Sequence, residues 1–133
     1  VDLGGDILGK PVDAADAIVF VYPTWWAGLP AMVKGWLDKV MVPGVGFGFD
    51  EHGRVVARLR HVRRLAGVTT YGSHRLAVAL TADGGRRTVM RALRISTAVR
   101  TRKTWLGLYG MDAATAEDSA RFLARVEREF RSW

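Results

Sequence analysis

The sequence lacks cysteine altogether and contains only four prolines and three histidines among its 133 residues. Without cysteine the chain can form no disulfide, no thiolate zinc site and no cysteine nucleophile. The three histidines, His52, His61 and His74, are not spaced as a set of metal ligands, so we expect no metal site. No apolar run approaches the roughly 20 residues of a membrane-spanning helix. These absences favour a cytoplasmic protein that does not insert into a membrane.

Negative charge is also scarce, because 13 acidic residues stand against 20 basic ones and give a net charge of +7. Arginine dominates the excess and gathers in segments 58–64 and 86–103. A positive excess attracts anionic partners, and nucleic acid and a phosphorylated cofactor are the two candidates. The arginines fall on expected helical faces while the aromatic residues lie elsewhere, which argues against nucleic acid.

The remaining composition, 49% apolar and 25% charged, predicts one globular domain spanning residues 1–133. Apolar segments at 17–22, 64–70 and 103–109 predict three strands, and the unbroken apolar run of the first predicts burial on both faces. Between and after these strands, helices are expected at 30–42, at 86–98 and beyond residue 112. Alternating strands and helices favour an α/β fold with a parallel sheet between helical layers.

Finer expectations concern the connecting segments and the last helix. Segment 45–53, with its glycines, is expected to be a loop, and Val55-Val56 a short strand or the start of a turn. Asp112 or Thr115 is expected to cap the last helix. The buried stripe of that helix is expected to comprise Phe122, Leu123, Val126 and Phe130.

The loops that follow the strands are the expected ligand-binding positions, because open parallel sheets bind ligands beyond the carboxyl ends of their strands. The first loop holds adjacent Trp25 and Trp26, whose large aromatic surface could form a wall for a flat ring system. Alternatively, one tryptophan anchors the loop and the other packs at a subunit interface. The second loop combines the hydroxyls of Thr69 and Thr70 with Gly72, which lets a backbone approach a ligand closely.

Three stretches of this sequence resemble one family. The run YPTWWAGLPAMVKGWLDKV, residues 22–40, resembles the signature of the NAD(P)H:quinone oxidoreductases of flavodoxin-like fold. The run PGVGF at 43–47 is similar to their Pro-Gly-Phe-Ala-Tyr loop, and TTYG at 69–72 is similar to their Thr-Thr-Gly-Gly loop. The resemblance extends over nearly the whole chain and implies a flavodoxin-like three-layer sandwich around a parallel sheet.

The resemblance implies a bound FAD or FMN, NAD(P)H as co-substrate, a quinone or similar acceptor, and a homodimer. The flavin would carry the redox chemistry, and the protein would stack, orient and tune it. The residues expected to contact the flavin are Pro23, Thr24, Trp25, Trp26, Ala27, Thr69, Thr70, Tyr71 and Gly72. A pocket for nicotinamide and quinone would involve Gly46, Phe47 and Gly48, supplied by the partner subunit.

The sequence departs from the family where a Tyr/His pair assists proton transfer beyond the second loop. Here Ser73 and His74 follow Gly72, and no matching pair comes after them. Tyr71 and His74 are the candidates for a catalytic role, and an exposed loop histidine is the alternative for His74. The catalytic residues otherwise stay unassigned.

A second departure is the beginning of the chain. The family starts with a strand, a phosphate-binding loop, a helix and a second strand, whereas this sequence begins just before the expected third strand. The segment Leu3-Gly4-Gly5-Asp6 is not expected to bind phosphate. We therefore expect an N-terminally truncated domain with three main strands and three main helices, or else a natural short variant. Truncation would leave segment 17–22 with an open apolar edge, and without the phosphate contacts the chain would bind flavin weakly or not at all.

A non-catalytic regulatory or binding subunit of the same fold is the alternative function, since a fold does not dictate catalysis. Oxidation of NAD(P)H by a quinone would separate the two. The sequence leaves open the electron acceptor, NADH against NADPH, and FAD against FMN.

Overall fold

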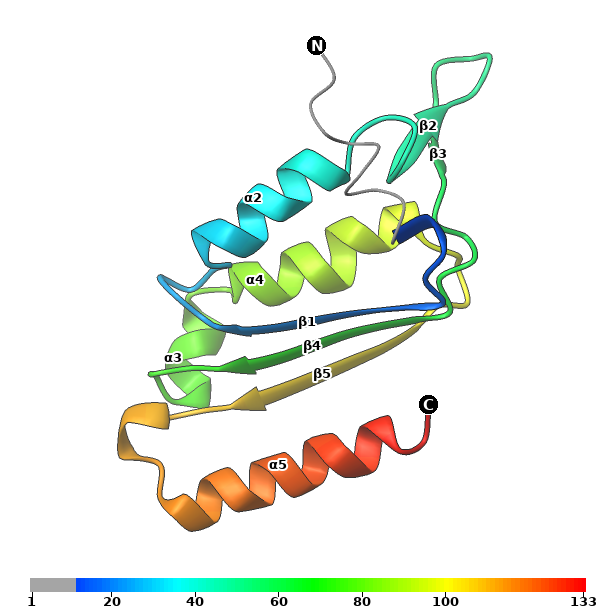
Figure 1. Cartoon of the computed structure of the whole chain (residues 1–133). Helices are drawn as coiled ribbons and strands as arrows, with labels where there is room; N and C mark the ends of the chain where they lie inside the picture. Colours follow the sequence, from blue (N-terminus) through cyan, green and yellow to red (C-terminus); the bar gives the residue numbers. More distant parts are fainter. Residues whose placement is uncertain (1–11) are drawn as a thin grey trace.

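A parallel sheet forms the centre of the computed structural model, which describes residues 12–133. Its strands are β1 (Ala17–Pro23), β4 (Arg64–Thr70) and β5 (Arg102–Leu108), in the order β1-β4-β5. Helices α2 (Ala31–Val40) and α4 (Gly84–Arg87) lie on one face and α5 (Ala116–Phe130) on the other (Figure 1). The expected α/β sandwich around three parallel strands is confirmed. The expectations for Leu3-Gly4-Gly5-Asp6 lie outside the described residues.

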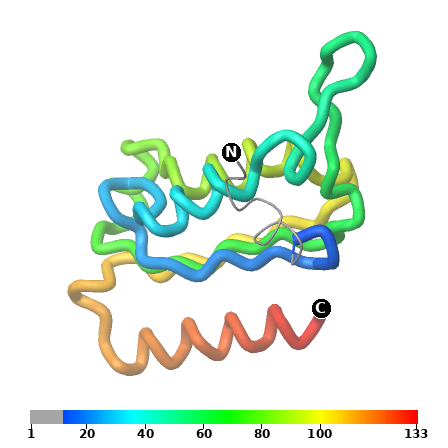
Figure 2. Tube along the Cα trace, turned by 45° about the horizontal axis from the view of Figure 1, so that its top comes forward, coloured from blue at the N-terminus to red at the C-terminus, as the bar shows by residue number. Residues whose placement is uncertain are grey.

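A short antiparallel hairpin replaces the loop expected at 45–53. Strand β2 (Phe47–Phe49) pairs with β3 (Val55–Ala57) in the register Phe47↔Ala57. The Asp50 carboxylate closes the turn by accepting from the backbone of His52 and of Arg54, each at 2.9 Å, and these bonds help lower its pKa. The hairpin projects from the end of the sheet where the strands begin (Figure 2). The short strand that was one alternative for Val55-Val56 is confirmed as β3, whereas β2 was not predicted, because a three-residue strand carries too little periodic signal.

Only one face of β1 is buried, so the expected burial on both faces is wrong. Ile18, Phe20 and Tyr22 are buried toward α2 and α4, while Val21 on the opposite face is 73% exposed. On that opposite face α5 contacts β5, where Glu129 accepts from Thr104 Oγ1 at 2.9 Å. Among the described residues β1 forms one edge of the sheet, in agreement with the open edge expected for segment 17–22.

The helical region after β4 is more broken than the sequence predicts. A six-residue helix that was not expected, α3 (Arg75–Leu80), follows the second loop. The helix expected at 86–98 consists of α4, the π-helical segment η1 (Thr88–Ala92) and the 3-10 segment η2 (Leu93–Ser96). The residues expected to face inward, Val89, Met90 and Leu93, are buried. Their burial explains why the hydrophobic pattern was readable although the helix is irregular.

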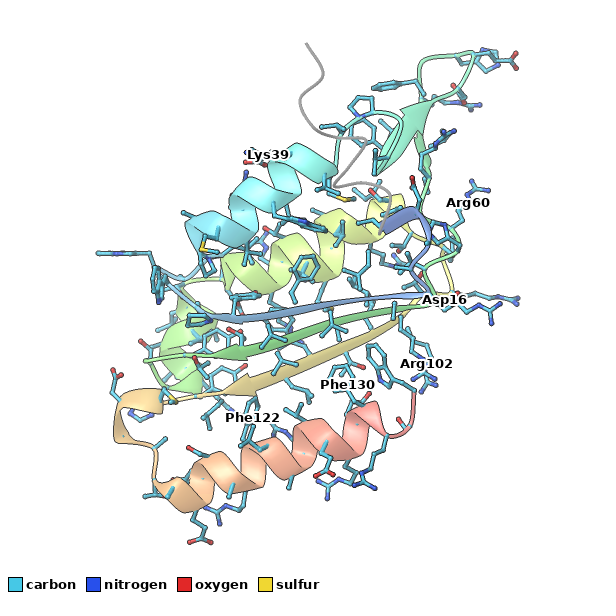
Figure 3. All side chains as sticks on the ribbon, viewed as in Figure 1. Asp16, Lys39, Arg60, Arg102, Phe122 and Phe130 are labelled. Carbon is cyan, nitrogen blue, oxygen red and sulfur yellow. The ribbon has the colours of Figure 1, made fainter. Side chains whose placement is uncertain are left out.

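Thr115 caps helix α5, and the alternative cap, Asp112, lies in the short 3-10 segment η3 (Met111–Ala113). Thr115 and Asp118 form a capping box: the Asp118 N–H donates to Thr115 Oγ1 at 3.1 Å, and Thr115 N–H donates to the Asp118 carboxylate at 2.9 Å. Phe122 and Phe130 project toward the sheet (Figure 3) and are half-buried, as is Val126. The expected burial of Leu123 is wrong, because Leu123 is 64% exposed on a neighbouring face.

The capping box predicts a specific acid sensitivity of α5. The Thr115 hydroxyl and backbone N–H, with Arg121, lower the pKa of Asp118 from 3.8 to about 2. A lowered carboxyl pKa stabilises the fold above the ordinary pKa, and this contribution is lost as the pH falls toward 2. We expect wild-type protein to be more stable than Asp118→Asn above pH 4, with the difference disappearing near pH 2 in urea titrations followed by circular dichroism. A difference independent of pH would contradict this role, and Glu117→Gln is the matched control.

Candidate functional site

A strained turn presents Trp26 to solvent after β1. Trp25 and Gly28 pair across the turn, with Gly28 N–H donating to Trp25 O at 2.9 Å, and the central residues Trp26 and Ala27 have φ of 48° and 55°. Positive φ at both central positions defines a type I′ turn, which normally selects glycine or asparagine. Left-handed conformations of other residues cost on the order of 1 kcal/mol each. The Trp26 side chain is fully exposed and Trp25 is 63% exposed, so core packing does not explain this strain.

Hydrogen bonds join this Trp25–Gly28 turn to the second loop. The Thr24 N–H donates to Thr70 O at 2.8 Å, and the hydroxyls of Thr24 and Thr69 lie 2.8 Å apart. From the other side, Gly84 N–H donates to Ala27 O at 2.8 Å. A Cβ at Gly84 would lie 3.0 Å from that same oxygen. The turn is therefore held on both sides by segments distant in sequence.

A cavity of about 430 Å³ lies between the turn and the second loop, at the carboxyl ends of β1 and β4. Its size is within the range of cofactor and ligand pockets. The lining residues are Thr24, Trp26, Ala27, Tyr71, Gly72, Ser73, Ala77, Val78 and Thr81. Five of these were expected at the flavin, whereas Ser73, Ala77, Val78 and Thr81 were missed. Ala77 and Val78 belong to α3, and Thr81 follows it. Trp25, Pro23, Thr69 and Thr70 are outside the lining.

A buried polar cluster supports the cavity wall. Tyr71 is 2% exposed, donates from its hydroxyl to Asp83 Oδ2 at 2.6 Å and accepts from Trp105 Nε1 at 3.0 Å. Burial, and then the bond to Asp83, raise the pKa of Tyr71, so the phenol stays neutral. The other Asp83 oxygen accepts from Arg86 N–H at 3.1 Å. This geometry directs the phenol proton to Asp83.

The neighbouring Tyr22 hydroxyl is buried and has no hydrogen-bond partner among the described residues. Burial, and then the Asp83 charge, raise the pKa of Tyr22 as well. Such a group carries a desolvation cost that a hydrogen bond normally offsets. Gly85 lies against this hydroxyl, because a Cβ there would be 2.8 Å from it.

His74 is exposed at the start of α3 and lines a different cavity, of about 410 Å³, between the end of β5 and α5. Tyr71 and His74 are thus not brought together in one cavity. Phe47 lines a further cavity beside α2, and with Gly46 and Gly48 it belongs to the hairpin region at the opposite end of the sheet (Figure 1). One chain does not assemble these three residues with the turn.

Other types of site find no support in the described part of the chain. Within residues 12–133, no three histidine or acidic side chains cluster as metal ligands would. Nor does this part contain a helix of sufficient length and apolarity to cross a bilayer.

Comparison with known proteins identifies the family to which this fold belongs. Residues 9–121 match the family model described as a flavodoxin-like fold, and the chain belongs to this family. Smu.1420 from Streptococcus mutans superimposes with a TM-score of 0.85 at 20% identity, over 99% of this chain and 70% of that one. An FMN-dependent NADH-azoreductase from Bacillus anthracis, solved with FMN, superimposes with a TM-score of 0.79 at 16% identity, over 94% and 59%. At these identities the superpositions establish the fold.

Sequence relatives carry oxidoreductase names. A human ribosyldihydronicotinamide dehydrogenase [quinone] is 33% identical over 81 residues, which is 59% of this chain and 33% of that protein. An uncharacterized NAD(P)H oxidoreductase from Haemophilus influenzae is 40% identical over 60 residues, which is 45% of this chain and 29% of that protein. The matched stretches therefore span about a third of the length of these relatives.

Proposed function

We propose that this chain is the flavin-binding part of an NAD(P)H oxidoreductase that passes hydride to a quinone or related acceptor. The observation that carries the proposal is the strained Trp26-Ala27 turn, which faces the second loop across a cavity of about 430 Å³. The family match and the names of the relatives support the same function. The basic excess of the chain suits an anionic cofactor, either FAD or FMN.

The residues present fit a flat, polar-edged ring. Trp26 and Ala27 supply an aromatic and apolar wall, while the hydroxyls of Thr24, Ser73 and Thr81 supply hydrogen-bonding groups at the cavity. A bound flavin would accept hydride from NAD(P)H and donate it to the acceptor. The chain's own part is to bind and orient this ring and to exclude water from one of its faces. Pro23, Trp25, Thr69 and Thr70 would support the turn from outside the lining.

A homodimer would complete this site. Gly46, Phe47 and Gly48 lie far from the turn of their own chain (Figure 1), so they could line a nicotinamide and quinone pocket only from a second copy. We propose this arrangement for the assembled enzyme.

Titration with FMN and with FAD tests the cofactor proposal. We expect saturable quenching of flavin fluorescence, and Trp26→Ala should weaken binding about 10- to 100-fold, because base–aromatic stacking contributes about 1–3 kcal/mol. Trp133→Ala is the matched control, since Trp133 packs on Phe130 at the end of the chain. Equal flavin affinity of wild-type protein and Trp26→Ala would contradict the role of the turn.

A non-catalytic binding subunit is the second candidate. Two observations favour it: His74 is outside the cavity lining, and the Tyr71 proton is committed to Asp83. Flavin binding without oxidation of NADH or NADPH by menadione would support this second function.

A further inference from the structure

A basic groove lies beside β5, apart from the proposed flavin cavity. It encloses about 840 Å³ and brings together Arg86 and Arg87 of α4, Arg91 of η1 and Lys103 of β5. Its apolar lining includes Met90 and Trp105. These cations belong to the arginine-rich segment that the flavin cavity does not use.

The four cations of this basic groove form none of the ion pairs found among residues 12–133. Asp83 is the one carboxylate in the lining, and its two oxygens already accept from the Tyr71 hydroxyl and from Arg86 N–H. Arg87 and Arg91 stand four residues apart, a spacing at which like charges destabilise a helix. The groove therefore holds exposed positive charge that folding alone does not explain.

The groove and the flavin cavity share a wall made of α3 and the turn after it. Val78 and Thr81 line the flavin cavity, whereas the adjacent residues Ala79 and Ala82 line the groove. A helix with its side chains is only about 10 Å thick. An extended ligand in the groove is thus a close neighbour of a ring bound against Trp26.

We propose that the basic groove binds the phosphate groups of the dinucleotide co-substrate, and that it selects NADPH over NADH through the 2′-phosphate. The planar guanidinium groups of Arg87 and Arg91 match phosphate oxygens in paired hydrogen bonds. Lys103 adds a point charge from β5. The link to hydride transfer rests on the proposed function, whereas the phosphate site itself does not.

The groove suits a nucleotide better than a nucleic-acid strand. Single-stranded nucleic acids need aromatic faces on which successive bases stack. The Trp105 indole is occupied, because it donates to Tyr71 at 3.0 Å, packs edge-on against Tyr22 and covers Gly67. Positive charge without an accessible aromatic face favours binding of the phosphate groups of a nucleotide over binding of a nucleic-acid strand.

Calorimetric titration of the chain with adenosine 2′,5′-bisphosphate and with 5′-AMP tests this proposal without flavin. We expect the bisphosphate to bind at least tenfold more tightly, because its 2′-phosphate adds charge-assisted hydrogen bonds to the guanidinium groups. The double variant Arg87→Ala/Arg91→Ala should lose this preference. Arg128→Ala is the control, because Arg128 is exposed on α5 across the sheet. In an active assembly, the double variant should raise KM for NADPH about tenfold more than it raises KM for NADH.

Three outcomes would overturn the proposal. The first is equal affinity for the two nucleotides, and the second is an unchanged preference in Arg87→Ala/Arg91→Ala. The third is tighter binding of a ten-nucleotide thymidine oligomer than of the bisphosphate, which would make the groove a nucleic-acid contact. If the chain binds the bisphosphate but not flavin, the phosphate site in the groove is supported and only the proposed function is contradicted.

Discussion

Gly67→Ala is expected to lower the free energy of unfolding by about 3 kcal/mol, the upper end of the usual cost of overpacking a core. Gly67 lies in β4 directly under the Trp105 indole of β5, and a Cβ at this position would overlap the ring carbons. The indole is not free to move away, because its Nε1 donates to the buried Tyr71 hydroxyl. Urea denaturation followed by circular dichroism measures the loss.

Gly35→Ala is the matched control and has the opposite sign. Gly35 lies within α2, and no atom approaches within 4 Å of a Cβ placed there. Alanine should therefore stabilise the helix by about 0.5–1 kcal/mol. The double variant Gly67→Ala/Trp105→Leu should be less destabilised than the sum of its single changes, because both act at one contact. Equal stability of Gly67→Ala and wild-type protein would contradict this packing.

Asp83→Asn is expected to cost about 2 kcal/mol, since it weakens two hydrogen bonds to a buried carboxylate. The carboxylate accepts from Tyr71 and from Arg86 N–H at the start of α4. Asparagine tolerates the left-handed backbone at this position, where φ is 41°. The change therefore tests the charge and its hydrogen bonds, with little effect on the turn.

The effects of Asp83→Asn and Tyr71→Phe should not be additive, with a coupling energy of about 1 kcal/mol in a double-mutant cycle. Asp112→Asn is the control: Asp112 is exposed, and its loss should change stability by less than about 0.5 kcal/mol. A fully additive cycle would show that the Tyr71–Asp83 bond does not contribute in solution.

The strands could be predicted because each is encoded by a short, continuous apolar segment of the sequence. The expected strands at 17–22, 64–70 and 103–109 each agree with the observed strand within one residue at either end. Burial of the two faces of β1 could not be predicted, because apolar valines are equally compatible with a covered and an open face. Whether the second face of β1 is covered depends on where α5 packs, and the tertiary structure determines that.

The sequence predicted the loops of the candidate site but not the contacts that hold these loops in place. Adjacent tryptophans after a strand indicate an aromatic wall, yet the positive φ at Trp26 has no sequence signature, since glycine or asparagine would be expected there. The Tyr71–Asp83 bond joins residues twelve apart across a helix that was not predicted. Helix α3 itself has only six residues, too few for a periodic pattern.

The most direct test of the flavin site is an amide nitrogen–proton correlation spectrum recorded while FMN is added to the labelled chain. The account predicts that the largest shifts fall on the amides of Thr24–Ala27 and Tyr71–Ser73, which flank the cavity of about 430 Å³. The amides of α5 (Ala116–Phe130) should stay in place. Shifts confined to the hairpin or to α5, with the turn unchanged, would contradict a flavin site between Trp26 and the second loop.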